Sequence, residues 1–349
     1  MFWQRAWYRQ GIDWRLWLLL PLHWLFCGIS YLRRTLYNLG VLKTYRPPVP
    51  VIVVGNISVG GTGKTPVTEA LIHWLRKQGH QPAIISRGYG AAGPFPQLVS
   101  TNSSAHAVGD EPKLLAVRTQ APLVVGPNRQ QAIELLLQTY PQTSIIVSDD
   151  GLQHYALARD IEVVVVDGQR GFGNGWLLPL GPLREPLSRL RSVDFIVQNG
   201  GNAALPIQQT SVWQFHLQSS QWLRVCDQQP ATLPPGNYAA VAGIGNPQRF
   251  FDTVHGQLAQ QQLSAPSKQA TIKLVTTHAF ADHYAFSAKD FVAFAQLTGV
   301  LMTEKDAAKC QPFAPENWYY LPVTAQFEAE FWRQFAQQLQ LKLVKFRKN

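Results

Sequence analysis

The first half of the chain alternates short apolar runs with longer amphipathic stretches. Six runs rich in Val and Ile have the length and composition of buried strands. They cover residues 51–54, 83–86, 122–125, 145–148, 161–166 and 193–197. Stretches with helical spacing lie between several of them, around 113–117 and 129–138. This alternation predicts an α/β fold with a doubly wound, mostly parallel sheet that places ligands at the carboxyl ends of its strands.

The second half loses this regularity after residue 199 and becomes rich in Gln, and residues 233–236 (LPPG) have the composition of a linker. A second, smaller α/β pattern follows, with a helix through Phe250 and Leu258. Its expected strands cover residues 238–242, 271–276, 300–303 and 318–323. The predicted organisation is an arm at 1–46, a first α/β domain at 47–200, a linker or hinge at 201–236, and a second α/β domain with a basic tail at 237–349.

The arm contains 17 nearly continuous apolar residues, Leu16 to Leu32, interrupted by His23 and bent or broken by Pro21. A membrane span takes about 20 residues, and Arg on both flanks gives no preferred orientation. A signal peptide would require a cleavage site of small residues after the apolar run, and none follows here. Tryptophan rings are suited to headgroup depth, and the arm has five, Trp3, Trp7, Trp14, Trp17 and Trp24. We expect a helix that lies in the membrane interface; a spanning helix and a buried core helix remain the alternatives.

The net charge of +10 is concentrated at the two ends. Residues 1–46 carry seven basic residues and one acid (+6), residues 342–349 carry four basic residues (+4), and residues 47–341 carry 20 of each sign. A nucleic-acid-binding protein would need a basic face on its folded body, so we expect no nucleic-acid partner. The three cysteines are far apart in sequence and form no CxxC pair, which gives neither a disulfide framework nor a thiolate metal site.

A glycine-rich segment, GNISVGGTGKT at 55–65, follows the first strand and precedes a helical stretch. This order is typical of a phosphate-binding loop, in which backbone N–H groups and the helix N-terminus approach phosphate oxygens. We expect Lys64 to reach the β- and γ-phosphates of a nucleoside triphosphate and Thr65 to ligate Mg²⁺. The strict motif has Gly where Ser58 stands. The predicted binding residues are Ser58, Val59, Gly60, Gly61, Thr62, Gly63, Lys64 and Thr65.

Acidic residues at strand ends are candidates for the magnesium side of the site. Asp149 and Asp150 end one buried strand, and we prefer them to Asp167, which a turn also explains. Asp110 opens a helix, so an N-cap role competes with a role as catalytic base. Likewise Asp282-His283 fits simple packing, and Arg184 fits either a phosphate clamp or a surface ion pair.

The segment TEKD at 303–306 departs from the guanine-binding [NT]KxD pattern, because its Lys directly precedes Asp. We therefore do not infer guanine. A P-loop GTPase or metal-insertion chaperone, associated with the membrane, remains the alternative function.

Taken together, the motifs resemble the tetraacyldisaccharide 4'-kinase family, which acts in lipid A biosynthesis. The resemblance covers nearly the whole chain and rests on the apolar arm, the Asp282-His283 element and the ordered motifs GNISVGGTGKTP, SRGYG, GDEP, DDGLQH, FGNG, GPLREP, AGIGNP and TEKD. Ser58 is no departure from this family, whereas Ala281 stands where the family often has Pro.

This resemblance implies transfer of the ATP γ-phosphate to the 4'-hydroxyl of a tetraacyl glucosamine disaccharide 1-phosphate, giving lipid IVA, with Mg²⁺ as cofactor. It implies Asp110 as catalytic base with His283 as its partner, assisted by Lys64. The implied substrate residues are Gln153, His154, Arg184 and Glu185. It also implies a peripheral or monotopic enzyme on the cytoplasmic face of the bacterial inner membrane, with no obligate protein partner.

Overall fold

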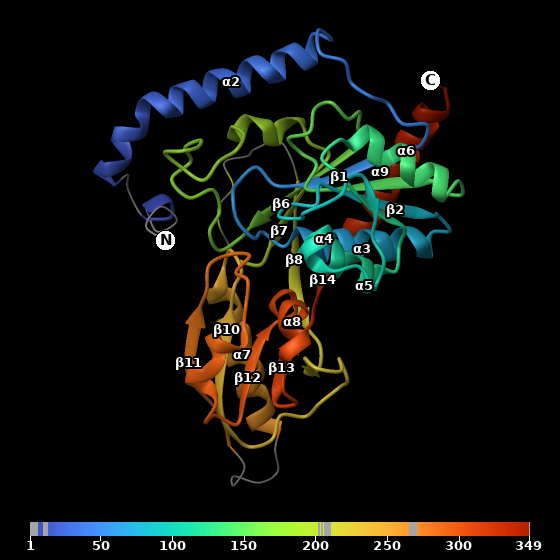
Figure 1. Cartoon of the computed structure of the whole chain (residues 1–349). Helices are drawn as coiled ribbons and strands as arrows, with labels where there is room; N and C mark the ends of the chain where they lie inside the picture. Colours follow the sequence, from blue (N-terminus) through green and yellow to red (C-terminus); the bar gives the residue numbers. More distant parts are fainter. Residues whose placement is uncertain are drawn as a thin grey trace.

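The computed structural model describes residues 6–9, 13–201, 203, 205, 211–264 and 271–348. The remaining residues of the predicted arm, 1–5 with Trp3 and 10–12, lie outside the described residues, as do 202, 204 and 206–210 of the predicted linker. The described chain forms two α/β units, with a long N-terminal helix across the far side of the larger one (Figure 1).

Nine strands of the described chain form the sheet of the larger unit, in the order β14-β8-β7-β6-β1-β5-β2-β4-β3. From β8 to β4 every neighbouring pair is parallel, and the edge strands β14 and β3 are antiparallel to their neighbours. The strands are β1 (Val51–Gly55), β2 (Pro82–Ser86), β3 (Gln97–Leu98), β4 (Leu123–Val125), β5 (Ile145–Asp149), β6 (Ile161–Asp167), β7 (Phe195–Asn199), β8 (Val212–Ser219) and β14 (Val323–Phe327). The predicted mostly parallel α/β fold is confirmed.

Helices cover both faces of this sheet, as expected for a doubly wound fold. One core forms where α3 (Lys64–Lys77), α5 (Asp110–Thr119) and α9 (Ala329–Lys348) pack on one face. A second core forms on the opposite face, under α6 (Arg129–Thr139) and the 3-10 turn η2 (Leu187–Ser192). A short helix, α4 (Ala105–Val108), precedes α5. The strands β1, β2, β4, β5, β6 and β7 are buried along their whole length, which explains the continuous Val and Ile runs in the sequence.

The smaller unit has a five-stranded sheet in the described chain, in the order β11-β10-β12-β13-β9. Helix α7 packs on one face with Phe250, Phe251 and Val254, and α8 and η3 pack on the other. The elements are β9 (Leu223–Arg224), β10 (Gly236–Ala242), α7 (Pro247–Ser264), β11 (Ile272–Ala279), η3 (Ala288–Phe294), β12 (Gly299–Thr303), α8 (Glu304–Cys310), η4 (Gln311–Phe313) and β13 (Trp318–Leu321).

The predicted domain boundaries need two corrections. The range 237–349 is too long for the second domain, because β14 pairs with β8 in the larger sheet and α9 buries Phe331, Phe335 and Leu339 in the larger unit's core. The range 201–236 is not only a linker, because it contains β8 of the larger sheet and β9 of the smaller one. The smaller unit thus ends with β13, and the chain then returns to the larger unit.

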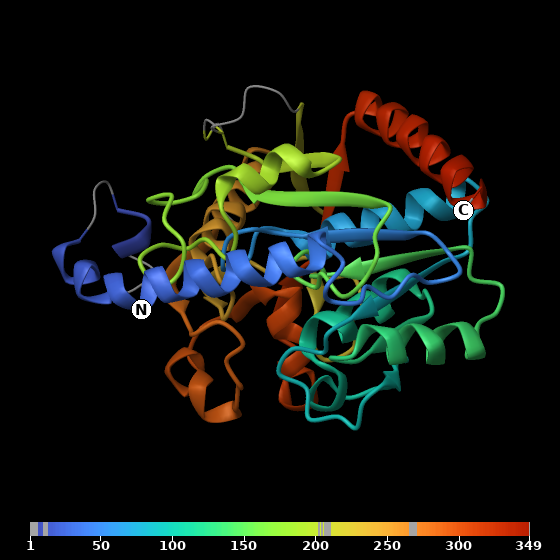
Figure 2. The ribbon, with the colours of Figure 1, turned by 90° about the horizontal axis from the view of Figure 1, so that it is seen from above.

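The arm forms a 3-10 turn, η1 (Trp14–Leu19), followed by α2 (Leu20–Asn38), which crosses the larger unit (Figure 2). Pro21 lies in the first turn of α2, where its missing N–H is tolerated, so it starts the helix rather than breaking it. Residues 14–38 are long and apolar enough to cross a membrane by length and composition, a test that some core helices and signal sequences also pass. Only 11% of the apolar window is buried, which argues against the core-helix alternative.

Candidate active site

The glycine-rich loop connects β1 to α3 and lies at the carboxyl end of the sheet. Gly60 and Gly63 have φ of +109° and +99°, values that favour glycine, and α3 begins directly afterwards at Lys64. The Thr62 hydroxyl is buried without a hydrogen-bond partner among the described residues. The loop therefore presents a helix N-terminus and an unpaired polar atom, which suits an anion.

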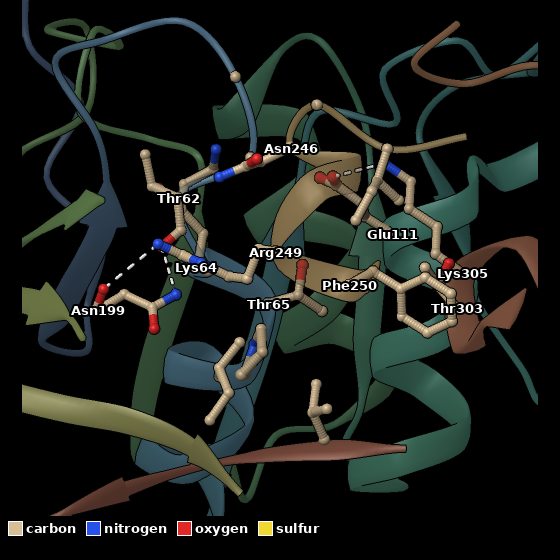
Figure 3. A pocket seen from close by; sticks show the side chains of 18 of the residues that line it. Thr62, Lys64, Thr65, Glu111, Asn199, Asn246, Arg249, Phe250, Thr303 and Lys305 are labelled. Atoms are coloured by element: carbon tan, nitrogen blue, oxygen red, sulfur yellow. Dashed lines mark hydrogen bonds and ion pairs between the residues drawn. The ribbon is translucent and has the colours of Figure 1, made fainter. Parts of the chain in front are cut away.

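A cavity of about 890 Å³ lies between this loop and the smaller unit. Residues 59–66 line one side, and Arg249, Phe250, Thr303 and Lys305 line the other (Figure 3). Seven of the eight predicted loop residues thus lie at the cavity. Ser58 is not among the residues that line the cavity, and its backbone forms an isolated bridge with Leu183.

A second cavity of about 800 Å³ lies between α2 and the larger unit. Helix α2 contributes apolar residues and two arginines to this cavity. The larger unit contributes Arg87, Arg129 and all four predicted substrate residues, Gln153, His154, Arg184 and Glu185. Five residues line both cavities, so that the two spaces meet at a common wall: Tyr89, Glu111, Asp150, Arg184 and His283.

The two predicted metal carboxylates have different surroundings. Asp149 is 1% exposed and accepts hydrogen bonds from the hydroxyls of Thr68 (3.3 Å) and Ser86 (3.5 Å). Burial, together with the negative charges nearby, raises the pKa of Asp149 to about 7. Asp150 instead lies at the common wall, with Oδ1 3.6 Å from Lys64 Nζ and Oδ2 3.5 Å from Arg184 Nη1. Asp149 therefore lines the second cavity alone, whereas Asp150 lines both cavities.

The donor set at this point fits a magnesium ion. The Oδ1 of Asp150 is buried and has no hydrogen-bond partner among the described residues, and Thr65 lines the same cavity. Mg²⁺ is usually held by one or two carboxylates together with phosphate oxygens and water. The described residues contain no group of three or more His, Cys, Asp or Glu that could hold a metal ion.

Asp110 and His283 lie together although 173 residues separate them. Asp110 is the first residue of α5, and His283 lies in the loop after β11 with a φ of +60°. The His283 Nδ1 is 3.3 Å from Asp110 Oδ2, and its Nε2 is 3.3 Å from Lys305 Nζ. Burial acts against ionisation of Asp110, but the hydrogen bond from His283 and the charge of Lys309 lower its pKa below the ordinary value. Asp110 is therefore ionised at neutral pH.

Sequence reasoning missed three charged residues of this site, Glu111, Lys305 and Lys309. The Lys305 Nζ is 3.1 Å from Glu111 Oε1, which joins α8 of the smaller unit to α5 of the larger one. Burial opposes ionisation of Glu111, but Lys305 and Lys64 lower its pKa to about 2. The only sequence signal was the charge within GDEP and TEKD, which does not reveal that these segments meet.

The predicted substrate residues all line the second cavity, but their side chains differ in how far contacts within the protein already engage them. Glu185 is 5% exposed, and its carboxylate accepts hydrogen bonds from Gln153 (2.8 Å) and from the Tyr155 hydroxyl. Its Oε2 also lies 3.2 Å from Arg189 Nε in an ion pair. Its oxygens are thus engaged in holding neighbouring side chains. Burial and the nearby arginines lower the pKa of His154 to about 4, so its ring is neutral at pH 7. Arg184 lies at the common wall.

Asp167 has the structural role expected of a turn residue, and it also contacts the smaller unit. It accepts from the backbone N–H groups of Gln169 (2.9 Å) and Arg170 (3.2 Å). It also forms a 2.5 Å ion pair with Arg249 and accepts from Asn246 (3.2 Å), both in the smaller unit. Its oxygens therefore join the two units beside the glycine-rich loop.

Comparisons with known proteins identify the family of the chain. A family model described as tetraacyldisaccharide-1-P 4'-kinase matches residues 15–340. Proteins named tetraacyldisaccharide 4'-kinase from Psychromonas ingrahamii and Idiomarina loihiensis are 49% and 46% identical over 330 and 327 residues, covering 94% and 93% of this chain and 96% and 94% of theirs. The crystal structure of LpxK from Aquifex aeolicus, an "apo" form in complex with ATP, has a TM-score of 0.73 at 28% identity and covers 95% of this chain and 99% of that one. The chain belongs to the tetraacyldisaccharide-1-P 4'-kinase family.

Proposed function

We propose that this chain transfers the γ-phosphate of ATP to the 4'-hydroxyl of a tetraacyl glucosamine disaccharide 1-phosphate, forming lipid IVA. As a member of its family the chain is a phosphotransferase. The observation that carries the proposal is the wall shared by the two cavities. A nucleotide in one cavity and an acceptor in the other would meet there, between Lys64 and the Asp110–His283 pair.

On the nucleotide side, phosphoryl transfer depends on positioning and on neutralising charge more than on covalent chemistry. Lys64 begins α3 and lines the first cavity, so its ammonium group would contact the transferred phosphate. Thr65 and Asp150 are the residues that would hold Mg²⁺, which when bound neutralises phosphate charge. Asp149 would support Asp150 from within the sheet, because its oxygens are already bonded to Thr68 and Ser86.

On the acceptor side, Asp110 would accept the proton of the sugar hydroxyl as the hydroxyl oxygen attacks phosphorus. The groups that hold it, His283 and Lys309, are both on Oδ2, which leaves Oδ1 for the hydroxyl. The His283 Nδ1–H fixes the orientation of the carboxylate, while its Nε2 faces Lys305. A base that is ionised at neutral pH and held in place suits this step.

The second cavity matches the chemistry of an acylated sugar phosphate. Arg33 and Arg34 of α2 face the same space as Arg87 and Arg129 of the larger unit, which provides positive charge for a phosphate. Apolar residues of the same cavity, Phe26, Ile29, Leu177 and Leu178, provide surface for acyl chains. Sugar contacts are assigned to Gln153, His154 and Arg184, with Glu185 holding Gln153 in place.

The arm is proposed to lie on the cytoplasmic face of the bacterial inner membrane as a monotopic helix. The arm carries exposed apolar residues, among them Leu18, Leu22, Trp24 and Leu25. Their burial among acyl chains, with basic residues near anionic headgroups, would hold the cavity at the surface where a four-chain lipid resides.

The test is phosphorylation of the purified disaccharide 1-phosphate by the full-length protein in mixed micelles, with ATP and Mg²⁺. We expect a product phosphorylated at the 4'-position and much weaker use of GTP. Asp110→Ala should lower kcat by roughly 10²- to 10⁴-fold, as for loss of a general base, with a small change in ATP affinity. Failure of folded wild-type protein to phosphorylate the lipid would overturn the proposal, and GTP-only turnover would favour the GTPase alternative.

A further inference from the structure

Lys309 is a largely buried cation at the junction of the two units, and the proposed reaction does not use it directly. Its side chain is 10% exposed, and its Nζ lies 3.1 Å from Asp110 Oδ2 and 3.8 Å from Asp306 Oδ1. The same Nζ donates to the carbonyl of Tyr284 at 3.2 Å, and it lies 5.8 Å from the ring of Phe286. An ammonium group held from four sides has little freedom to move.

Asp306 fixes this lysine within the smaller unit. It is fully buried and accepts from the Gly243 N–H at 2.9 Å and from the Thr303 hydroxyl at 2.6 Å, both on Oδ2. Its Oδ1 has no hydrogen-bond partner among the described residues and faces Lys309 across 3.8 Å. Lys309 therefore lies between an acid of its own unit and Asp110 of the larger unit.

We propose that Lys309 is a positioning residue, which holds the carboxylate of Asp110 in place for the acceptor and makes this placement depend on the arrangement of the two units. The inference rests on the proposed function, in which Asp110 is the base. Both groups that bond to Asp110 Oδ2, Lys309 and His283, come from the smaller unit, whereas Asp110 belongs to α5. The base is thus aligned only when the smaller unit is seated against α5.

The charges that face Asp110 come from three segments. Helix α8 brings Lys305 and Lys309 with Asp306 behind them, and the loop after β11 brings Asp282 and His283. Helix α5, which carries Asp110, adds Glu111, and Lys305 neutralises the charge of Glu111. Lys309 is the lysine within ion-pair distance of Asp110 in the described structure, so its removal takes away the nearest full positive charge.

The experiment compares Lys309→Met with Lys309→Arg and with the control Lys289→Met, an exposed lysine of η3. We expect Lys309→Met to lower kcat roughly ten- to hundredfold, a part of what a general base contributes, with KM for ATP changed less than about twofold. The acidic limb of the pH–kcat/KM profile should move to higher pH by about one unit, because a carboxylate that loses a nearby cation is more easily protonated. Lys309→Arg should restore most of the rate, and the control should match wild type.

A second variant separates positioning from folding. Lys309→Met leaves the buried Asp306 without its cation, so the double variant Asp306→Asn/Lys309→Met should recover thermal stability while its acidic limb stays shifted. An unshifted limb in folded Lys309→Met, or recovery of full kcat in the double variant, would overturn the inference. Titration of the Asp110 carboxyl by ¹³C NMR, identified by its loss in Asp110→Asn, should show the same upward pKa shift without substrate. This readout stands even where wild type fails to phosphorylate the disaccharide, so the two proposals fail separately.

Discussion

Removal of one buried side chain should release the arm from the larger unit. His23 is the residue of α2 whose side chain is buried in the described structure, at 4% exposure. Its Nδ1 lies 3.0 Å from the carbonyl oxygen of Leu177, and its ring packs against Trp176 with centroids 5.2 Å apart at 62°. His23→Ala deletes both contacts, and we expect α2 to detach more often from the second cavity.

The expected magnitude follows from these two contacts. A net hydrogen bond contributes about 1 kcal/mol, and an edge-to-face ring pair contributes about 1 kcal/mol. A loss of about 2 kcal/mol raises the detached population roughly 30-fold. Because α2 supplies one side of the acceptor cavity, the KM for the lipid should rise while the KM for ATP stays constant.

Limited trypsin digestion in detergent measures the detached state, because Arg33 and Arg34 lie within α2 and cleavage tracks the open population when reclosing is fast. We expect cleavage after these residues to accelerate roughly 30-fold in His23→Ala. Leu22→Ala is the matched control, since Leu22 is 55% exposed on the same helix and its loss should leave cleavage unchanged. Equal cleavage of His23→Ala and wild type would refute the argument that His23 holds the arm.

Three further predictions concern stability, measured by urea unfolding. Phe335→Ala should destabilise the larger unit by about 3–5 kcal/mol, because the ring is fully buried under α9, whereas Leu341→Ala, 56% exposed on the same helix, should change stability by less than about 0.5 kcal/mol. Burial raises the pKa of Glu304 to about 7. Its protonated form therefore stabilises the folded state fully below about pH 4.5, and this stabilisation is lost as the pH rises through 7. The free energy of unfolding should fall by up to about 3 kcal/mol between pH 5 and 8, and Glu304→Gln should make this fall smaller. Parallel pH curves for the two proteins would contradict this assignment. Arg249→Leu leaves the buried Asp167 unpaired and should cost about 3 kcal/mol, most of which Asp167→Asn/Arg249→Leu should recover.

The parts of the molecule that the sequence predicted are those encoded by contiguous residues. The glycine-rich loop, Lys64 and the helix after it form one unbroken segment, so the local pattern was sufficient. Asp149 and Asp150 were placed near the loop because they are adjacent carboxylates at the end of a buried strand, and β5 does pair with β1, the strand before the loop. Ser58 was predicted to bind the nucleotide from its motif position, and the structure adds a backbone bridge to Leu183, 125 residues away, which the motif does not contain.

The parts that were missed depend on contacts between distant segments. Glu111 and Lys305 are 194 residues apart, and neither has a local pattern that distinguishes it from a solvent-exposed charge. The amphipathic pattern of α9 indicates a helix but does not say which sheet it covers. Strand β14 determines where α9 packs, because β14 pairs with β8 with Val323 opposite Ser219. This pairing places the helix that follows on the larger unit.

The same register has a mechanical consequence. The chain leaves the larger sheet after Ser219 and re-enters it at Val323, and these two residues are paired neighbours. Just beyond them, the Ser220 N–H donates to the Pro322 carbonyl oxygen at 3.0 Å. The smaller unit is therefore an insertion into the larger one, suspended from two strands side by side rather than from one tether. Because both connections leave the larger sheet at one place, the position of the smaller unit over the glycine-rich loop is set by noncovalent contacts, such as the Arg249–Asp167 and Lys305–Glu111 ion pairs.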